Sequence, residues 1–488
     1  MQTKKHKINT LCIYFAHNLC YIKLEQEESE MKDIYLTRYS VKGIKTLDQL
    51  ISLSFYKKTI SKNPNTQEYN IKGIYGMNGS GKSGIITSVE ILRNLLIDPG
   101  YLNNPIAQKN LDAIINKGTE ELFIEAEYMV NLKESPLLFR YSVTLTRDTS
   151  GKYAVTHECL FGKKATSRND SMDIVYEVSG GEIVFISGIN EHSKFSADIQ
   201  SKTMNLLETA TMCALFYEKF LLSAIKNQEH HQGNLWIGLC LLYFFGKELH
   251  VYLDQSDDHR NYVAQISLEH YDDSEKYKNE IDTVLSRFLK MNNDYLNVLS
   301  ASGNIVSKQM YINFEKDVHK LYDFLHIFKS DLQGIEIDKK ENHNLWVCDL
   351  IMEYSSYRIH AEYESTGIKK LIRLFAYIKE MVEGGIVFID EFDSNLHDVY
   401  LCALLEYLME YGEGQLCFTT HNVGPMDILK QRKKSIDFLS ENHQIYSWKT
   451  NGNYSPSRLY RNGMIEGSPF NVDSIDFIGV FGSGGEDE

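Results

Sequence analysis

The stretch that decides the fold reads Gly76-Met77-Asn78-Gly79-Ser80-Gly81-Lys82-Ser83. It matches the phosphate-binding loop pattern G-x-x-x-x-G-K-[ST], in which glycines let backbone N–H groups surround an anion without a Cβ in the way. In this pattern the lysine reaches the outer phosphates of a nucleotide, and the final hydroxyl binds Mg²⁺. The sequence therefore predicts that all eight residues line a site for ATP and Mg²⁺, with Lys82 on the phosphates and Ser83 on the metal ion.

The segments on either side of the loop predict the strand and the helix that such a loop needs. Residues 70–75 read N-I-K-G-I-Y, a short and mostly apolar run that is typical of a buried strand. Apolar side chains then recur at helical spacing at Ile85, Ile86, Val89, Leu92 and Leu96. A helix that begins near Lys82 also directs the positive end of its dipole at the phosphates.

A second apolar strand, over residues 385–389, ends in two adjacent carboxylates, Asp390 and Glu391. Asp390 at the end of a strand is placed to hold Mg²⁺ opposite Ser83. Glu391 is then placed to orient or deprotonate the attacking water. An apolar run that ends in Asp-Glu is a weak signal by itself, because many strands end at solvent. Together with the phosphate-binding loop it predicts a site for ATP hydrolysis.

Three further segments follow the same order along the chain. Ser365 precedes an amphipathic helix, where it caps the helix or, with Gly367, presents free N–H groups to a phosphate. Residues 394–397 read S-N-L-H and follow the two carboxylates. A third apolar strand runs over residues 416–420 and ends at His421, where we expect a contact to the γ-phosphate.

This set of motifs resembles the ABC-type ATPases, including the structural-maintenance-of-chromosomes (SMC) group. Residues 78–83 look like their phosphate loop, and residues 364–368 look like a degenerate signature motif, Leu-Ser-Gly-Gly-Gln, of which the serine and the second glycine remain. Residues 394–397 look like the D-loop, with His397 where aspartate is usual, and His421 looks like the switch histidine. The glutamine of the Q-loop has no assigned counterpart.

The resemblance implies an α/β fold, that of a P-loop NTPase with an ABC-type ATPase head. It also implies homo-oligomers built from head-to-tail pairs, in which ATP on one subunit's phosphate loop is closed over by the other subunit's Ser365 and Gly367. In such a site Glu391, His421 and Lys82 are the catalytic residues, and ATP and Mg²⁺ are the cofactors.

Other patterns divide the chain into four parts. Residues 121–128 and 139–145 alternate apolar and polar side chains, and Gly180-Gly181 separates two further short runs, so we expect antiparallel strands and a hairpin there. These elements belong to a first ATPase lobe over residues 31–200. The remaining parts are an N-terminal extension over residues 1–30 that contributes nothing to the ATP site, a mostly helical insertion over 201–345, and a second ATPase lobe over 346–488.

The composition is that of a soluble globular protein, with 43% hydrophobic and 24% charged residues. The net charge of −15 argues against wholesale nucleic-acid binding but leaves room for a local basic patch. The eight cysteines form no C-x-x-C pair, which favours free thiols in the cytoplasm. The longest apolar run, residues 235–245, is too short to span a bilayer, so no membrane partner is expected.

Two functions remain open. The chain is similar to OLD-like bacterial ATPases and to the ATPases of PARIS-type anti-phage systems, but the stretch after His421 is too short for a Toprim nuclease. This favours a sensor and scaffold for abortive infection that controls a separate Toprim-type nuclease effector and responds to a phage trigger protein. The alternative is a DNA-repair or recombination ATPase of the SMC/RecF type. Residues 432–434, R-K-K, are a DNA contact in that case and a solvated charge cluster in the first.

Overall fold

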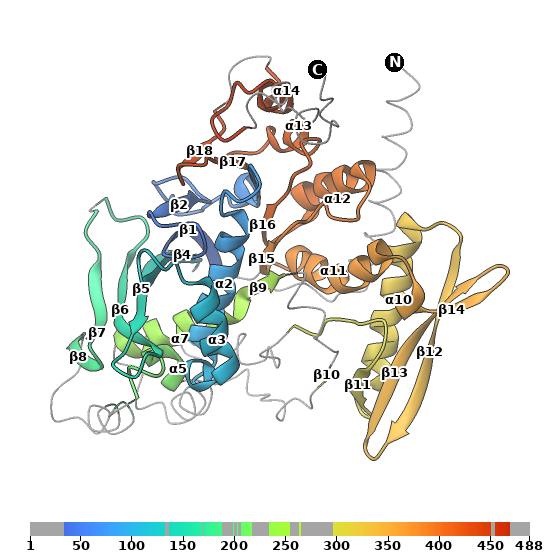
Figure 1. Cartoon of the computed structure of the whole chain (residues 1–488), viewed down its shortest axis with the longest axis horizontal. Coiled ribbons are helices and arrows are strands. Elements are labelled where there is room, and N and C mark those ends of the chain that lie inside the picture. The colour runs from blue at the N-terminus through green and yellow to red at the C-terminus, as the bar shows by residue number, and fades with distance from the viewer. Residues whose placement is uncertain are drawn as a thin grey trace, which may run out of the picture.

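The computed structural model describes residues 34–131, 136–168, 170–187, 199, 203, 206–216, 234–253, 263–264, 296–449 and 454–468. The expectations for residues 1–30 lie outside this part of the chain. The described residues form three sheets with helices packed between and around them (Figure 1).

A six-stranded sheet carries the predicted nucleotide motifs, in the order β18-β17-β3-β16-β15-β9. Its strands are β3 (Ile71–Gly76), β9 (Leu249–Tyr252), β15 (Ile386–Ile389), β16 (Gln415–Thr419), β17 (Ile436–Leu439) and β18 (Ile445–Ser447). All neighbours pair in parallel except β17 and β18. Parallel strands end at one edge, so the phosphate-binding loop after β3, Asp390 after β15 and His421 after β16 share that edge.

The two faces of this sheet are covered by different helices, because the residues of β3, β15, β16 and β17 are buried on both sides. On β15, Phe388 belongs to the hydrophobic cluster that contains helix α2 (Lys82–Ile97). Its neighbours Val387 and Ile389 belong to the cluster that contains α11 (Thr366–Val382) and α12 (Asp398–Tyr411). Figure 1 shows α2 on one side of β15 and β16, with α11 and α12 on the other.

A seven-stranded antiparallel sheet packs over α2, in the order β2-β1-β4-β5-β6-β7-β8. Its strands are β1 (Ile34–Lys42), β2 (Ile51–Ser54), β4 (Glu121–Val130), β5 (Leu137–Arg147), β6 (Tyr153–Lys164), β7 (Asp173–Ser179) and β8 (Glu182–Ile186). The alternation expected on β4 is present, since Leu122, Ile124 and Ala126 are fully buried. Gly180 and Gly181 join β7 to β8 with φ of 57° and 76°, which suits a tight hairpin.

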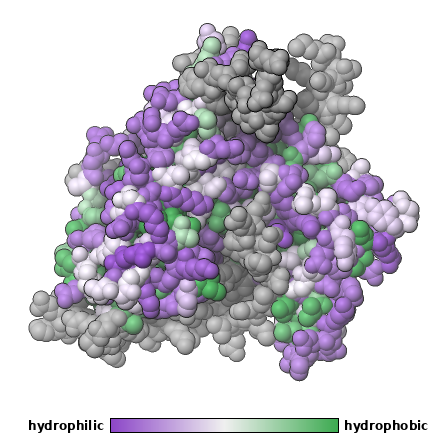
Figure 2. Space-filling model, in the orientation of Figure 1, coloured by the Kyte–Doolittle hydropathy of each residue, from purple (hydrophilic) through white to green (hydrophobic). Residues whose placement is uncertain are grey.

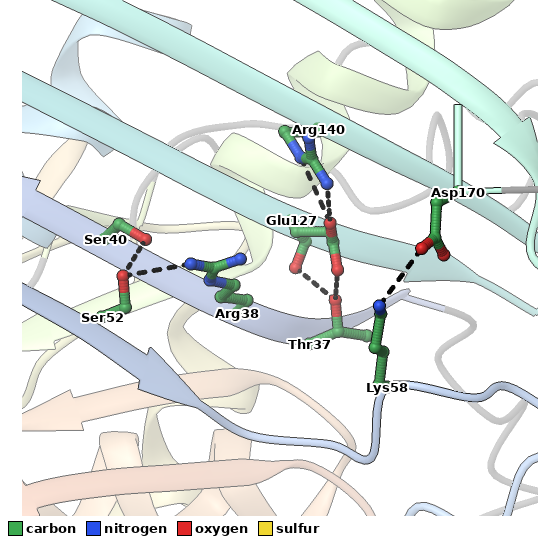
Figure 3. Close-up of polar contacts among 8 residues, drawn as sticks. All are labelled: Thr37, Arg38, Ser40, Ser52, Lys58, Glu127, Arg140 and Asp170. Carbon is green, nitrogen blue, oxygen red and sulfur yellow. Dashed lines mark hydrogen bonds and ion pairs between the residues drawn. The ribbon is translucent and has the colours of Figure 1, made fainter. Parts of the chain in front are cut away.

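One irregularity in this sheet is stabilised by a polar network. Thr37 lies where the register of β1 against β4 shifts between Leu36 and Arg38. Its hydroxyl donates to the backbone oxygen of Glu127 at 2.8 Å, and Arg140 donates to the Glu127 carboxylate at 2.9 Å (Figure 3). The extra residue therefore keeps its polar atoms paired, as a bulge in a buried sheet requires.

The segment that we expected to be mostly helical, residues 201–345, contains strands as well as helices in its described part. Its described part holds α5 (Met212–Leu215), α7 (Asn234–Glu248) and α10 (Tyr311–Phe328), but also β9 and most of a third sheet. That sheet contains β10 (Val263–Ala264), β11 (Asn304–Ser307), β12 (Leu332–Asn342), β13 (Leu345–Tyr354) and β14 (Arg358–His360). Strand β9 has four residues that follow directly on the apolar helix α7, so periodicity does not distinguish it from that helix.

The hydropathy of the surface and the state of the cysteines are those of an ordinary globular protein. The view in Figure 2 is mainly hydrophilic, with apolar side chains in small separate groups. All six cysteines in the described ranges are free thiols, as predicted. No helix in the described part of the chain is long and apolar enough to cross a membrane.

Candidate nucleotide site

The phosphate-binding loop follows β3 without interruption and leads into α2, as predicted. Gly79 and Gly81 have φ of 80° and 106°, a conformation that favours glycine. A Cβ on Gly81 would lie 2.5 Å from Leu47 Cδ2, and a Cβ on Gly76 would lie 2.5 Å from the backbone oxygen of Leu439. A Cβ on Gly79 would meet no atom within 4 Å, so the loop is tightly held at both ends and open in the middle.

Lys82 is buried at the base of this loop, with 6% of its surface exposed. Its ammonium donates to the backbone oxygens of Gly76 at 2.7 Å and Met77 at 2.9 Å. Burial lowers the pKa of Lys82 to about 8, although the nearby carboxylates of Asp390 and Glu391 oppose the shift. A buried lysine that lacks enough compensating charge is a favourable place for a polyanion.

A second polar atom in the loop supports the same interpretation. The hydroxyl of Ser80 is buried and has no hydrogen-bond partner within the described part of the chain. Buried polar atoms are rarely left unpaired unless a ligand or water satisfies them. The donors of this loop therefore fit the phosphates of ATP, whose binding remains a prediction.

We expect the affinity for ATP to fall as pH rises above about 8, because Lys82 then loses its proton. Below that pKa the lysine is charged and its contribution is complete. A bound polyanion favours the charged form, so ATP binding near pH ~8.5 should take up a proton. Calorimetry in two buffers of different ionisation enthalpy measures this uptake. Equal binding enthalpies in both buffers would contradict it.

The predicted metal site combines Ser83, in the first turn of α2, with Asp390, directly after β15. The described residues contain no group of three or more His, Cys, Asp or Glu side chains that would form a complete metal cage. Mg²⁺ is commonly held by one or two protein oxygens together with substrate phosphates and waters. A hydroxyl and a carboxylate therefore fit this ion, which would neutralise charge on the phosphates when it is bound.

Thr419, the last residue of β16, contacts the Asp390 carboxylate and the Glu391 backbone, and it was not identified from the sequence. Its hydroxyl donates to Asp390 Oδ1 at 2.5 Å and accepts from the backbone N–H of Glu391 at 2.8 Å. This arrangement leaves the second oxygen of Asp390 for a metal ion and orients the start of the following turn. Its only sequence signal is the polar pair Thr419-Thr420 at the end of an apolar strand.

Glu391 begins the turn after β15 with its side chain exposed and with φ of 47°. A non-glycine residue in this left-handed region is unusual and tends to occur at functional sites. The exposed carboxylate faces solvent at the edge where the loop ends, which suits a group that acts on water. Its role as the base remains a prediction.

His421 lies at the same edge of the sheet. Asp393, which was not identified from the sequence, contacts its backbone. The backbone N–H of His421 lies 3.3 Å from both carboxylate oxygens of Asp393. Asp393 also lies close enough to Lys82 to favour its charged form. The structure thus brings Lys82, Asp390, Glu391 and His421 together at one edge, with Asp393 between them.

Ser365 is the N-cap of α11, since its hydroxyl accepts from the backbone N–H of Ile368 at 3.3 Å. Ser365 is exposed, and the first N–H groups of a helix have no acceptor within the helix. Capping and phosphate binding are therefore compatible at this helix start. Gly367 is required by packing as well, because a Cβ there would lie 2.7 Å from the backbone oxygen of Asn395.

The start of α11 lies at the same edge of the sheet as Lys82 but over the opposite face. The helix ends just before β15, at the amino-terminal edge, and its first turn contacts Asn395 beyond the carboxyl end of that strand. Helix α2 covers the other face (Figure 1). One chain therefore presents the phosphate-binding loop and Ser365 on two separate surfaces.

His397 of the D-loop-like segment and Gln108, which belongs to no assigned motif, both have local roles. His397 caps α12 by accepting from the backbone N–H of Val399 at 3.3 Å. Gln108, on α3 (Pro105–Ile114), donates to the backbone oxygens of Leu102 and Tyr153 and accepts from the Tyr153 N–H. These hydrogen bonds give the Gln108 side chain a structural role. The Q-loop glutamine therefore still has no assigned counterpart.

The sheet order, the loop between β3 and α2, and the strand β15 that ends at Asp390 are those of a P-loop NTPase fold of the AAA/ABC type. A family model described as "AAA domain, putative AbiEii toxin, Type IV TA system" matches residues 244–427. This range contains Ser365, Asp390, Glu391 and His421, and it leaves the phosphate-binding loop outside. A comparison with curated proteins gave no match.

Among solved structures, 86 chains are similar to this one. One is the Smc head domain with an extended coiled coil, bound to the C-terminal domain of ScpA, from Pyrococcus furiosus. It is 13% identical with a TM-score of 0.34, and the match covers 85% of this chain and 96% of that chain. Another is the SMC head domain from Thermotoga maritima, which is 12% identical with a TM-score of 0.31. That match covers 85% of this chain and 99% of the Thermotoga chain.

Proposed function

We propose that this protein hydrolyses ATP in head-to-tail pairs and uses its ATP state to control a separate toxic effector. The observation that carries the pairing is the position of Ser365. Its helix start is exposed at the edge of the sheet that holds Lys82, but over the opposite face. A second copy turned by half a revolution would bring its Ser365 and Gly367 to the first copy's phosphates. Binding energy would then be converted into closure of the pair.

The effector part of the proposal rests on resemblance. The description of the matching family model names a putative toxin of a toxin–antitoxin system. The match includes the region from Ser365 to His421. The motifs also resemble those of AriA, the ATPase of the PARIS anti-phage system, whose partner AriB is a Toprim nuclease. We infer a chain that holds an AriB-like nuclease and releases it when a phage protein acts as the trigger.

The alternative is an ATPase that acts directly on DNA, and its candidate contact, residues 432–434, has partners within the chain. Arg432 donates to the backbone oxygen of Met409, and Lys433 forms an ion pair with Glu68. Lys434 donates to the hydroxyl of Ser54 at 2.6 Å and to the backbone oxygen of Tyr56 at 3.0 Å. These three cations join separate elements of the protein, which favours the structural role over a DNA contact.

The purified chain is therefore expected to cleave neither DNA nor RNA, and to bind duplex DNA weakly. Co-expression with the product of an adjacent nuclease gene should yield a stable complex in which the nuclease is silent. The measurements are nucleic-acid cleavage, co-purification, and DNA binding as a function of salt. Cleavage by a partner-free preparation that a substitution in this chain abolishes would contradict the proposal. Tight DNA binding with a steep salt slope would favour the alternative.

A further inference from the structure

Lys370 is a buried lysine on α11, with 4% of its surface exposed. Its ammonium donates to the backbone oxygen of Glu391 at 2.6 Å and contacts the hydroxyl of Ser394. It also lies 5.6 Å from the centre of the Tyr252 ring, at the end of β9. Lysine is rarely buried to this extent, because its charge loses hydration, unless the contacts it makes compensate for that loss.

The carbonyl group that Lys370 holds belongs to the residue with the unusual backbone. Glu391 has φ of 47°, and Asn395, four residues later, has φ of 60°. Such conformations persist only where the surrounding structure holds them. On one side of this turn, Thr419 accepts from the Glu391 N–H at 2.8 Å. On the other side, Lys370 donates to the Glu391 carbonyl, so both peptide groups of the residue are held.

The start of α11 and this turn are also in direct contact. Gly367 lies against the backbone of Asn395, where a Cβ would come within 2.7 Å of the carbonyl oxygen. The hydroxyl of Thr366 donates to Asn395 Oδ1 at 3.4 Å. Since Lys370 is on the next turn of the same helix, a tilt of α11 would displace the turn from Glu391 to Asn395 with it.

We propose that Lys370 is a positioning residue that links the phosphate-contacting start of α11 to the orientation of Glu391. Ser365 lies five residues before Lys370 on the same helix. When a second copy's nucleotide docks on Ser365, the resulting shift of α11 is transmitted through Lys370 to the backbone of Glu391. Hydrolysis in one site is thereby made dependent on ATP in the other. This inference rests on the proposed pairing.

The test replaces Lys370 by methionine in the full-length protein. Lys370→Met keeps the aliphatic stem but removes the donor, so kcat should fall by about 10², the usual cost of misplacing a catalytic group. The affinity for ATP should change by less than about three-fold, because the lysine touches no phosphate. Lys370→Arg should retain part of the activity. The control is Lys379→Met on the same helix, whose lysine contacts Asp317 at 3.4 Å, and turnover should stay at the wild-type level.

A double-mutant cycle with Glu391→Gln separates positioning from a general structural role. If Lys370 acts through Glu391, adding Lys370→Met to Glu391→Gln should lower kcat no further. An equal loss in both backgrounds would overturn the inference, as would normal kcat in Lys370→Met. If Lys370→Met fails to fold, Ser394→Ala removes one contact of the Lys370 ammonium and should show the same non-additivity. If Glu391→Gln alone leaves kcat unchanged, the proposed catalytic site fails instead.

Discussion

Replacing Lys82 by alanine is expected to abolish detectable ATP binding and leave the fold in place. The substitution removes the buried cation at the base of the phosphate-binding loop. Hydrogen bonds to charged groups contribute about 1.5–3 kcal/mol each, so losing contacts to two phosphates should weaken binding by roughly 10²–10⁴. The fold should persist because the two hydrogen bonds that Lys82 donates end on the loop itself, at the backbone oxygens of Gly76 and Met77.

Thermal unfolding with and without nucleotide checks both parts of this prediction. A ligand at about 100 times its Kd stabilises the folded state by about 2.7 kcal/mol. ATP should therefore raise the unfolding temperature of the wild-type protein but not that of Lys82→Ala. The control is Lys42→Ala, which breaks a surface ion pair with Glu121. That control should keep the shift, since such pairs contribute little. Unchanged ATP affinity in Lys82→Ala would refute the assignment of the loop.

Replacing Glu391 by glutamine is expected to stop hydrolysis and retain ATP binding. The amide keeps the size and hydrogen bonding of the carboxylate but cannot accept the proton of the attacking water. Loss of a positioned base should lower kcat by about 10² or more. The left-handed backbone at Glu391 should tolerate the change, because its conformation is held by Thr419 and Lys370 through backbone atoms.

The same variant tests the pairing. With ATP present and hydrolysis blocked, the closed pair should persist, and its mass in solution should exceed that measured without ATP. Adding Ser365→Arg should reopen it, because a bulky cation would block the approach of the neighbour's γ-phosphate. Glu315→Gln, an exposed carboxylate on α10, is the control and should leave turnover unchanged. Normal hydrolysis by Glu391→Gln would exclude Glu391 as the base. A double variant that still closes would remove Ser365 from the composite site.

The local parts of the fold follow from the sequence alone. The strand at residues 71–76, the loop and the helix from Lys82 were all predicted, because burial on both faces, glycine conformation and helical periodicity are local signals. The alternation on β4 and β5 and the Gly180-Gly181 hairpin were predicted for the same reason. The motif order also indicated a P-loop ATPase, and the arrangement of Asp390 and His421 at the edge beside Lys82 agrees with it.

The contacts between distant segments were decided only by the tertiary structure. Strand β9 pairs with β15 although Tyr252 and Ile386 are 134 positions apart in the sequence, and nothing in the four residues of β9 specifies that partner. Thr419, Asp393 and Lys370 acquire their roles from atoms on other elements, so their sequence neighbours carry little signal. Residues 432–434 read as a basic run in the sequence. In the structure their side chains contact Met409, Glu68 and Ser54, which only folding brings near.

The separation of Ser365 from Lys82 has the same origin. Ser365 and Lys82 each lie at the start of a helix, α11 and α2, within a recognisable motif. Which face of the sheet each helix covers depends on where the chain crosses the sheet. Alternate side chains of β15 pack against α2 and against α11, so each face has its own hydrophobic cluster. Residue patterns predicted two phosphate-contacting segments, and tertiary packing placed them over opposite faces of the sheet, because burial of both faces requires helices on each.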